Sequence, residues 1–463
     1  MLAAMVDHAW NAEPRLIAAA PPAAGRFPWL LSRFLVPGLG LLLLALFAAL
    51  YTVDRPLYTQ ALATWGADPF RFPFVDTDSN LAAIDCARRG ADVFAFNPCA
   101  AVIGRYNYSP LLLLATHLPV TRAWTVPIGL AIDLLFLAAL AALPAPRRLA
   151  EQAVRIAATL SPITAFAMER ANFDVFLLAL TVAAGLLVVR AGKTRLLAYP
   201  LLLLAAVIKY YPVMALVVAL RDRRKAIFGI AAACAAVLLA FVLTWHADIL
   251  RSIAGQPRAL YYVAAFGAVN LPRGLPALMV ALALSPAREH LFGDVLFLIL
   301  IAYALFCAAR WVRNPAFRDH ILGLADTDLA LLVVGAAVLV PCFFASQSVY
   351  YRAIFILPAL PGLLAPSRNG RTNPAFGPVA LMAPFLLWAE CGRFGLMAAT
   401  DAATPAAAAV WRMASCGLWL ARELVWWQFI ALLGAVLWLF VQASPLWPRG
   451  LPRRATGPQV AKA

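Results

Sequence analysis

Long apolar runs separated by short polar connectors dominate the chain. Runs such as 34–51, 124–143 and 226–245 are as long as an α-helix needs to cross a hydrocarbon core of about 30 Å. Helices are expected there because backbone groups in lipid must be satisfied within the segment. The pattern predicts about twelve membrane segments, roughly at 34–52, 123–143, 152–168, 173–189, 196–208, 211–220, 226–245, 292–309, 327–345, 352–366, 376–397 and 424–442.

The stretch between residues 196 and 220 is expected to break into two short helices. Basic clusters flank it on both sides, and one straight helix would place them on opposite faces of the membrane. Pro212, in the sequence Lys209-Tyr-Tyr-Pro212, lacks a backbone donor and ends the preceding helix. Non-helical backbone at membrane depth is tolerated only inside protein or beside a water-filled cavity. Lys209 is therefore predicted to line a cavity.

Short connectors rich in Arg and Lys set the predicted orientation, since positive charge stays on the cytoplasmic side. Both termini are then cytoplasmic in a multi-pass protein of the cell inner (plasma) membrane. The predicted organisation is a cytoplasmic segment 1–33, one membrane domain 34–442 and a flexible basic cytoplasmic tail 443–463, with long outer loops at 53–122, 246–291 and 398–423.

Composition supports this class. The chain is 64% hydrophobic and 13% charged over 463 residues, which leaves too few charges to cover a water-soluble surface. The net charge of +16 follows from the basic connectors and favours contact with anionic membrane lipids, not with nucleic acid. The expected fold is all-α, a polytopic transmembrane helical bundle with a structured first outer loop.

The first outer loop carries two closely spaced acids. Asp76 and Asp78 follow an apolar Phe-Pro-Phe-Val run, and alternation in an extended segment would put both side chains on one face. Two nearby carboxylates can supply a general base. Alternatively, Asp78 caps a helix starting near Ser79, because aspartate is a favoured N-cap residue. The sequence leaves both possibilities open.

Two cysteines share this loop. An oxidising compartment would let Cys86 and Cys99 form a disulfide, and free buried thiols are the alternative. The cysteine spacings do not resemble zinc sites, and no histidine stands at ligand spacing, so no metal is predicted.

Further polar groups lie at the outer ends of membrane segments. The turn Glu169-Arg-Ala-Asn-Phe-Asp174 joins two apolar segments, where ionisable side chains are costly and indicate function. The sequence Gln347-Ser-Val-Tyr-Tyr-Arg352 has the same placement. Asp133 differs because it lies in mid-membrane, and we expect it to hydrogen-bond to a neighbouring helix.

The order of these motifs resembles the GT-C superfamily of membrane glycosyltransferases. It is most similar to the bacterial branch that uses polyprenyl-phosphate sugars, including the polyprenyl-phosphate-mannose-dependent mannosyltransferases. The resemblance covers most of residues 30–366. Its motifs are the outer-loop aspartate after the first helix, Gly90-Ala-Asp-Val-Phe94, Tyr106-Asn-Tyr-Ser-Pro110, Arg170-Ala-Asn-Phe-Asp174, Lys209-Tyr-Tyr-Pro212 and Tyr351-Arg352.

This resemblance implies an inverting sugar transfer on the periplasmic or extracytoplasmic side. Asp78 or Asp76 would deprotonate a hydroxyl of a glycan or glycolipid acceptor, which attacks the anomeric carbon of a polyprenyl-phosphate sugar donor. A departing phosphate needs positive charge or oriented donors, and the expected groups are Lys209, Arg352, Tyr351 and Arg170. No cofactor is expected. The further substrate-binding candidates are Tyr106, Asn107, Tyr108, Glu169, Asn172, Asp174, Tyr211, Gln347 and His246.

Two other functions fit parts of the pattern. A transporter or lipid flippase would share the helices, the broken pair and the buried charges, but the acids gather in outer loops and no inverted repeat is evident. A membrane acyltransferase would need a buried histidine to activate the acceptor, but the candidates near the outer side, His117, His246 and His290, have no supporting neighbours.

Overall fold

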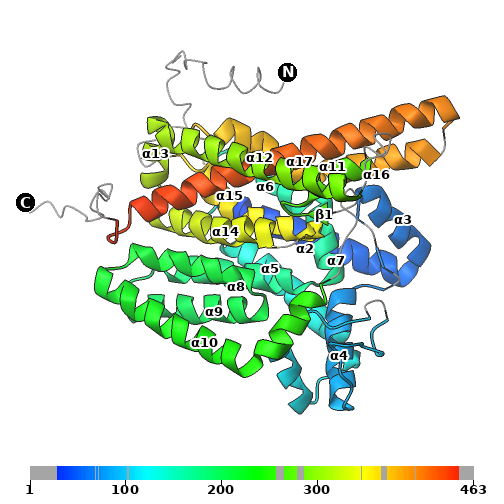
Figure 1. The fold of residues 1–463 in the computed structure, drawn as a ribbon, viewed down its shortest axis with the longest axis horizontal. Coiled ribbons are helices and arrows are strands. Elements are labelled where there is room, and N and C mark those ends of the chain that lie inside the picture. The colour runs from blue at the N-terminus through cyan, green and yellow to red at the C-terminus, as the bar shows by residue number, and fades with distance from the viewer. Residues whose placement is uncertain are drawn as a thin grey trace, which may run out of the picture.

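The computed structural model describes most of the chain, and most of that part is helical (Figure 1). Of the predicted terminal segments, residues 1–28 and 448–463 lie outside the described part. Within the described part, the one sheet has two short antiparallel strands, β1 (Ala265–Phe266) and β2 (Ser348–Val349). The all-α class is therefore confirmed. The described residues are 29–67, 69–70, 72–101, 104–256, 265–278, 286–345, 347–366, 373–401 and 403–447.

Seven helices in the described ranges are long and apolar enough to cross a membrane. A further pair, α7 (Pro162–Arg170) and α8 (Phe173–Leu187), passes the same test together but is bent by 107°, which makes up to eight. The predicted twelve crossings are therefore not matched by helices of spanning length. The seven are α2 (Trp29–Val53), α5 (Thr125–Ala142), α10 (Arg224–Ala254), α12 (Pro286–Arg313), α14 (Asp326–Ala345), α16 (Phe376–Asp401) and α17 (Pro405–Gln442).

The remaining predicted segments are short helices. An 11-residue α-helix extends only about 16 Å, roughly half of the hydrocarbon core, so none of these can cross alone. A proline marks one of the starts, because Pro212 stands in the first turn of η4. These elements are α6 (Leu149–Thr159), α9 (Ala198–Ile208), η4 (Tyr211–Arg221), η6 (Tyr350–Phe355) and α15 (Ile356–Leu364).

The predicted outer segment 398–423 is helical rather than an irregular loop. Helix α16 continues to Asp401, and α17 begins at Pro405 and runs for 38 residues, so helix covers nearly all of this range. The sequence after Pro405 is rich in alanine, which has the highest helix propensity, and Pro405 suits a first helical turn. The two helices pack against each other as a long hairpin at the edge of the bundle (Figure 1).

Helix α14 forms the middle of the bundle. It is almost wholly buried and packs against α8, α15, α17 and η4 (Figure 1). Peripheral helices α10 and α12 instead expose many large apolar side chains, such as Leu243 and Leu298. Such faces suit contact with lipid chains, and a buried central helix with apolar outer helices is the arrangement expected of a membrane bundle.

The predicted first outer loop, 53–122, is largely helical. Its helix α4 lies at one end of the bundle, and α3 and α7 lie towards the same end, on the right of Figure 1. The loop contains α3 (Arg55–Trp65), α4 (Val75–Arg88), η1 (Pro110–His117) and the start of η2 (Arg122–Trp124); the other short helices are η3 (Gly192–Leu197), α11 (Asn270–Leu278) and α13 (Pro315–Leu322).

Candidate functional site

Helix α4 carries both candidate bases in its first turn. It begins at Val75, earlier than the predicted start near Ser79, and its N-cap residue Phe74 makes no side-chain capping bond. The predicted capping role of Asp78 is therefore wrong. The predicted common face is wrong as well, because residues two apart on a helix point to different sides. Asp76 and Asp78 lie on an α-helix and meet different partners.

The start of α4 is fixed by close packing against two other helices. Phe74 has a left-handed backbone (φ 65°), and its N–H donates to the carbonyl oxygen of Glu169 at 2.6 Å. A Cβ at Gly129 of α5 would lie 2.4 Å from the Phe74 ring, so only glycine leaves room for it. Thr77 Oγ1 donates to the Ala171 carbonyl at 2.8 Å. These contacts hold α4 against the bend between α7 and α8.

The bend between α7 and α8 turns several polar side chains towards α4. Ala171 adopts a left-handed backbone (φ 41°), which ends α7. Asn172 then caps α8, since its Oδ1 accepts the N–H of Asp174 at 2.9 Å. The predicted turn between two apolar segments is therefore confirmed, with a sharp change in direction.

Asp76 is held by the residues of this bend. It is 2% exposed, and Arg170 donates to both of its oxygens, with Nε 2.8 Å from Oδ2. Asn172 Nδ2 donates to the same Oδ2. The guanidinium of Arg170 also lies over the rings of Phe70, at 4.5 Å, and Tyr351, at 5.8 Å. Aromatic faces attract such a cation, so Arg170 is fixed on several sides.

Asp174 forms ion pairs with two cations from separate segments. Lys209 Nζ lies 2.8 Å from its Oδ1, and Tyr211 donates its hydroxyl to the same oxygen. Arg352 Nε lies 3.5 Å from Oδ2, a looser ion pair. Lys209 has an extended backbone between α9 and η4, so the predicted helix break is confirmed.

Asn172 connects the two groups. Its Oδ1 accepts from Lys209 Nζ at 2.9 Å, and its Nδ2 donates to the Tyr108 hydroxyl at 3.1 Å as well as to Asp76. Lys209 also lies 5.0 Å from the centre of the Tyr108 ring. Burial raises the pKa of Tyr108, so this hydroxyl stays protonated. We call the six charged residues Asp76, Glu169, Arg170, Asp174, Lys209 and Arg352 the central charge cluster.

Asp78 belongs to a different region, beneath the loop that follows α4. Arg122 donates from Nε and Nη2 to its two oxygens at 2.7 and 2.8 Å, and Thr125 Oγ1 lies 3.2 Å away. The Arg122 side chain is 42% exposed, whereas that of Arg170 is 9% exposed. The Asp78 pair therefore meets water where the Asp76 pair does not.

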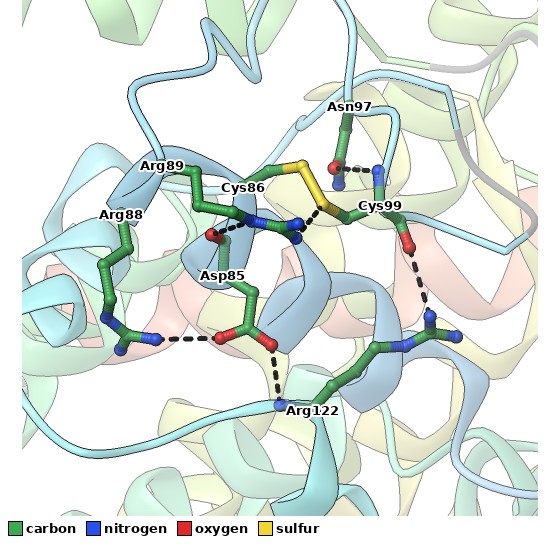
Figure 2. The surroundings of a disulfide bond; sticks show 7 residues. All are labelled: Asp85, Cys86, Arg88, Arg89, Asn97, Cys99 and Arg122. Carbon is green, nitrogen blue, oxygen red and sulfur yellow. Dashed lines mark hydrogen bonds and ion pairs between the residues drawn. A yellow bond between two sulfur atoms is a disulfide. The ribbon is translucent and has the colours of Figure 1, made fainter.

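Figure 2 shows how Arg122 is tied to the disulfide region. Of the two alternatives for Cys86 and Cys99, the structure has the disulfide. The backbone N–H of Arg122 donates to Asp85 at 3.0 Å, and its Nη1 donates to the Cys99 carbonyl at 3.3 Å. Arg88 holds the other oxygen of Asp85. These bonds join the end of α4, the disulfide loop and the start of α5.

Several predicted site residues lie away from the central charge cluster. The Tyr106 hydroxyl donates to the Ser109 carbonyl inside a small separate core. Asn107 contributes its backbone carbonyl, which accepts from Gln256. Gln347 donates to Asn270 near the two strands. His246 is exposed on α10, because this helix continues past the predicted loop start to Ala254.

Sequence reasoning missed some of the contacts. Arg122 is the clearest case, since a basic residue at the outer end of a predicted segment goes against the positive-inside pattern and signals a local partner. Phe70 and Tyr58 carry no such signal. Asp133 is also corrected, because in the described part of the chain neither of its carboxylate oxygens has a hydrogen-bond partner.

Comparison with known proteins adds no relative: no family model, no curated protein and no solved structure matches this chain. In the described ranges, no three His, Cys, Asp or Glu side chains gather in a way that could hold a metal ion.

Proposed function

We propose that this chain is an inverting membrane glycosyltransferase. It moves a sugar from a polyprenyl-phosphate donor to a hydroxyl of a glycan or glycolipid acceptor on the extracytoplasmic side, with both termini in the cytoplasm. The observation that carries the proposal is the convergence of three cations from separate segments on two neighbouring acids. Arg170 pairs with Asp76, whereas Lys209 and Arg352 pair with Asp174, and Asn172 bonds to both Asp76 and Lys209.

The three cations suit a phosphate that departs at the membrane boundary. Arg352 makes one loose ion pair and a weak contact with the Cys342 sulfur, and among the described residues it has no other hydrogen bond, so most of its N–H donors can meet a ligand. Preorganised donors in a site that excludes water stabilise developing charge more strongly than they do in water. Donor phosphate therefore binds Arg352 and Lys209 first.

Asp76 is the general base in this proposal. It shares Arg170 with the phosphate site, and a bound phosphate competes for that guanidinium and frees a carboxylate oxygen. The acceptor hydroxyl then gives its proton to Asp76 and attacks the anomeric carbon, while the bond from that carbon to the phosphate oxygen breaks. Asp78 keeps a structural role, because its partner Arg122 serves the disulfide region.

A transporter or lipid flippase is the second candidate. The bend between α7 and α8 and the break at Lys209 are favourable to it, since transporters place ligand sites at interrupted helices. Both candidates bind a lipid phosphate. They differ in whether the sugar leaves the donor.

A transfer assay on the purified protein tests the proposal. Labelled polyprenyl-phosphate mannose and related donors are supplied with membrane glycans in proteoliposomes. We expect Asp76→Asn to lower turnover by about 10²–10⁴-fold with donor binding retained, because the amide keeps the size but cannot accept a proton. Matched Asp78→Asn should stay within about tenfold of the parent.

The phosphate site has its own measurement. Lys209→Met and Arg352→Met should weaken donor binding, which Asp76→Asn should not do. If Asp76→Asn transfers sugar at the normal rate, Asp76 is not the general base. Movement of intact donor across the bilayer without sugar transfer supports the transporter instead.

A further inference from the structure

Glu169 is the member of the central charge cluster that lacks a cation of its own. It ends α7 and is 6% exposed. Its Oε1 accepts a long hydrogen bond of 3.4 Å from the Tyr58 hydroxyl, and in the described part of the chain its Oε2 has no hydrogen-bond partner. Asp76 and Asp174, by contrast, each pair with arginine or lysine. The backbone of Phe70 also hydrogen-bonds to Glu169, but no ion pair holds this carboxylate in the described part of the chain. A buried acid without an ion pair is the easiest of the three to protonate.

Before any ligand arrives, the charges of the cluster sum to zero only at a pH at which Glu169 is ionised. Arg170, Lys209 and Arg352 are positive, and the three acids offset them only while Glu169 is ionised. A sugar phosphodiester adds one negative charge to this buried site. An uncompensated charge in a low-dielectric site costs several kcal/mol in order-of-magnitude terms, which a proton can remove.

We propose that Glu169 takes up one proton from water when a singly charged sugar phosphodiester binds the central charge cluster, so that ligand binding and protonation are coupled. The carboxylate becomes a neutral carboxylic acid, and no other bond is made or broken in this step. This inference rests on the proposed function only in that the ligand is a lipid phosphodiester.

The Tyr58 hydroxyl fits both forms of Glu169. A tyrosine hydroxyl donates to an ionised carboxylate and accepts from a protonated one, so the contact survives the change. Tyr58 lies on α3 and packs edge-on against Tyr51 of α2 at 5.3 Å, which keeps water away from this side. The pKa of Tyr58 is raised, mainly by burial, so its hydroxyl keeps its proton in both forms of Glu169.

The other charged groups near Glu169 are accounted for. Asp76 of α4 and the neighbouring Arg170 act on it electrostatically and pair with each other. Asp133 of α5 acts on Glu169 electrostatically, and in the described part of the chain neither of its carboxylate oxygens has a hydrogen-bond partner. The elements packed against α7 contribute further titratable or charged groups, and each acid among them pairs with a base. These groups are Glu151 and Arg155 of α6, Asp174 of α8, Tyr351 and Arg352 of η6, and Glu390 and Arg393 of α16.

Calorimetry with a water-soluble short-chain prenyl phosphosugar tests the coupling. This ligand keeps a single charge across the working range, so it does not itself take up protons. Titrations of the full protein in buffers with different ionisation enthalpies should give an uptake of about one proton per ligand. Over the range in which the free protein holds Glu169 ionised, affinity should rise about tenfold for each unit that the pH falls.

Variants assign the proton to Glu169. Glu169→Gln should bind the ligand with no proton uptake and no pH dependence, because the amide mimics the protonated acid. Glu289→Gln, an exposed site at the start of α12, is the matched control and should behave like the parent. Tyr58→Phe should keep the uptake of one proton but move the pH at which it occurs. Asp133→Asn should leave the coupling unchanged.

The outcomes separate this inference from the enzyme proposal. Binding by the parent without proton uptake at any pH overturns the coupling, and this result needs no variant to fold. Uptake that persists in Glu169→Gln overturns it too, because another group then takes the proton. Coupled binding without any sugar transfer leaves the inference standing and removes the glycosyltransferase. Absence of ligand binding at every pH removes both.

Discussion

Asp76 and Asp78 lie two residues apart on α4 but have different environments. Asp76 points to the α7–α8 bend and is held by Arg170, whose side chain is 9% exposed. Asp78 points to the disulfide region and is held by Arg122, whose side chain is 42% exposed. Both pairs have the same two-pronged geometry, so the contrast comes from solvent and neighbours alone.

The helical period of α4 decides where the side chains of Asp76 and Asp78 point. In an extended segment the two acids would share a face and a task, whereas the helix sends one into the bundle and the other under a loop. Breaking a buried ion pair leaves an uncompensated charge, but an exposed pair is replaced by water. The two sides of α4 should therefore respond very differently to matched changes.

Removing the arginine from each pair gives the largest expected difference. Arg170→Met should lower the free energy of unfolding by about 3–5 kcal/mol, since Asp76 is left buried without its cation. Matched Arg122→Met should cost less, about 1–2 kcal/mol, because solvent screens the partly exposed Arg122, although Asp78 itself is only 5% exposed. Equilibrium unfolding in detergent, followed by tryptophan fluorescence, measures both. Equal losses for the two variants would mean that both acids share one environment.

Opening the disulfide acts on the Asp78 side alone. The bond joins residues 13 apart, and the chain-entropy model gives a stabilisation of about 3 kcal/mol for a loop of this size. Replacing Cys86 and Cys99 together by serine should lower stability by about that amount. Phosphosugar binding should not change, because the central charge cluster is anchored by other contacts. Cys416→Ser, at an exposed free cysteine, is the control.

If the double serine variant lost phosphosugar affinity as well as stability, the Asp76 and Asp78 sides of α4 would not be independent. Mass spectrometry of protein purified without reductant provides the second check, and it should find Cys86 and Cys99 joined.

Local chemistry predicted part of this arrangement. Pro212 lacks a backbone donor and Lys209 precedes it, so the break there follows from sequence, as does the polar turn between Glu169 and Asp174. The gathering of Lys209, Arg170 and Arg352 around two neighbouring acids was expected from their predicted common side of the membrane. The break and the turn each depend on residues that are close together in the sequence, so a local pattern is enough to predict them.

Long-range packing decided the rest. The start of α4 depends on Phe74, whose left-handed backbone is held by the Glu169 carbonyl and the space at Gly129. The partner of Asp78 lies 44 residues further along the chain. Neither contact leaves a periodic signal. The missed helix after Pro405 has another cause, since alanine-rich helix with scattered polar residues resembles a loop when only hydropathy is considered.

Two threonines allow a finer comparison. Thr77→Val should cost about 1–3 kcal/mol, because it leaves the Ala171 carbonyl buried without its donor at the bend. Thr125→Val should cost about 0.5–1.5 kcal/mol, since the shorter bond of its hydroxyl, 2.8 Å, goes to the partly buried Arg122 carbonyl and Asp78 keeps both bonds from Arg122. Thermal unfolding of the two isosteric variants measures the difference. A larger loss for Thr125→Val would reverse the assignment of the buried side.

The smallest effect is expected in the loop that follows the disulfide side of α4. Asp92 pairs with Arg251 at the end of α10, and that hydrogen bond lowers the pKa of Asp92 below its ordinary value. A lowered pKa means that the pair stabilises the folded state above the ordinary aspartate pKa of about 3.9 and that this stabilisation is lost as the pH falls through the lowered value. Asp92→Asn should therefore be slightly less stable than the parent at neutral pH and equal to it in strong acid.

Both partners of this pair are about half exposed, so salt should shrink the difference at neutral pH. Hydrogen exchange of the amides at 92–97, compared between parent and variant at low and high salt, measures it. Asp248→Asn is the control, because Asp248 approaches the same arginine only to 3.6 Å and its loss should change exchange less. A difference that grows in acid, or that resists salt, would place Asp92 in an environment like that of Asp76 and would erase the contrast between the two sides of α4.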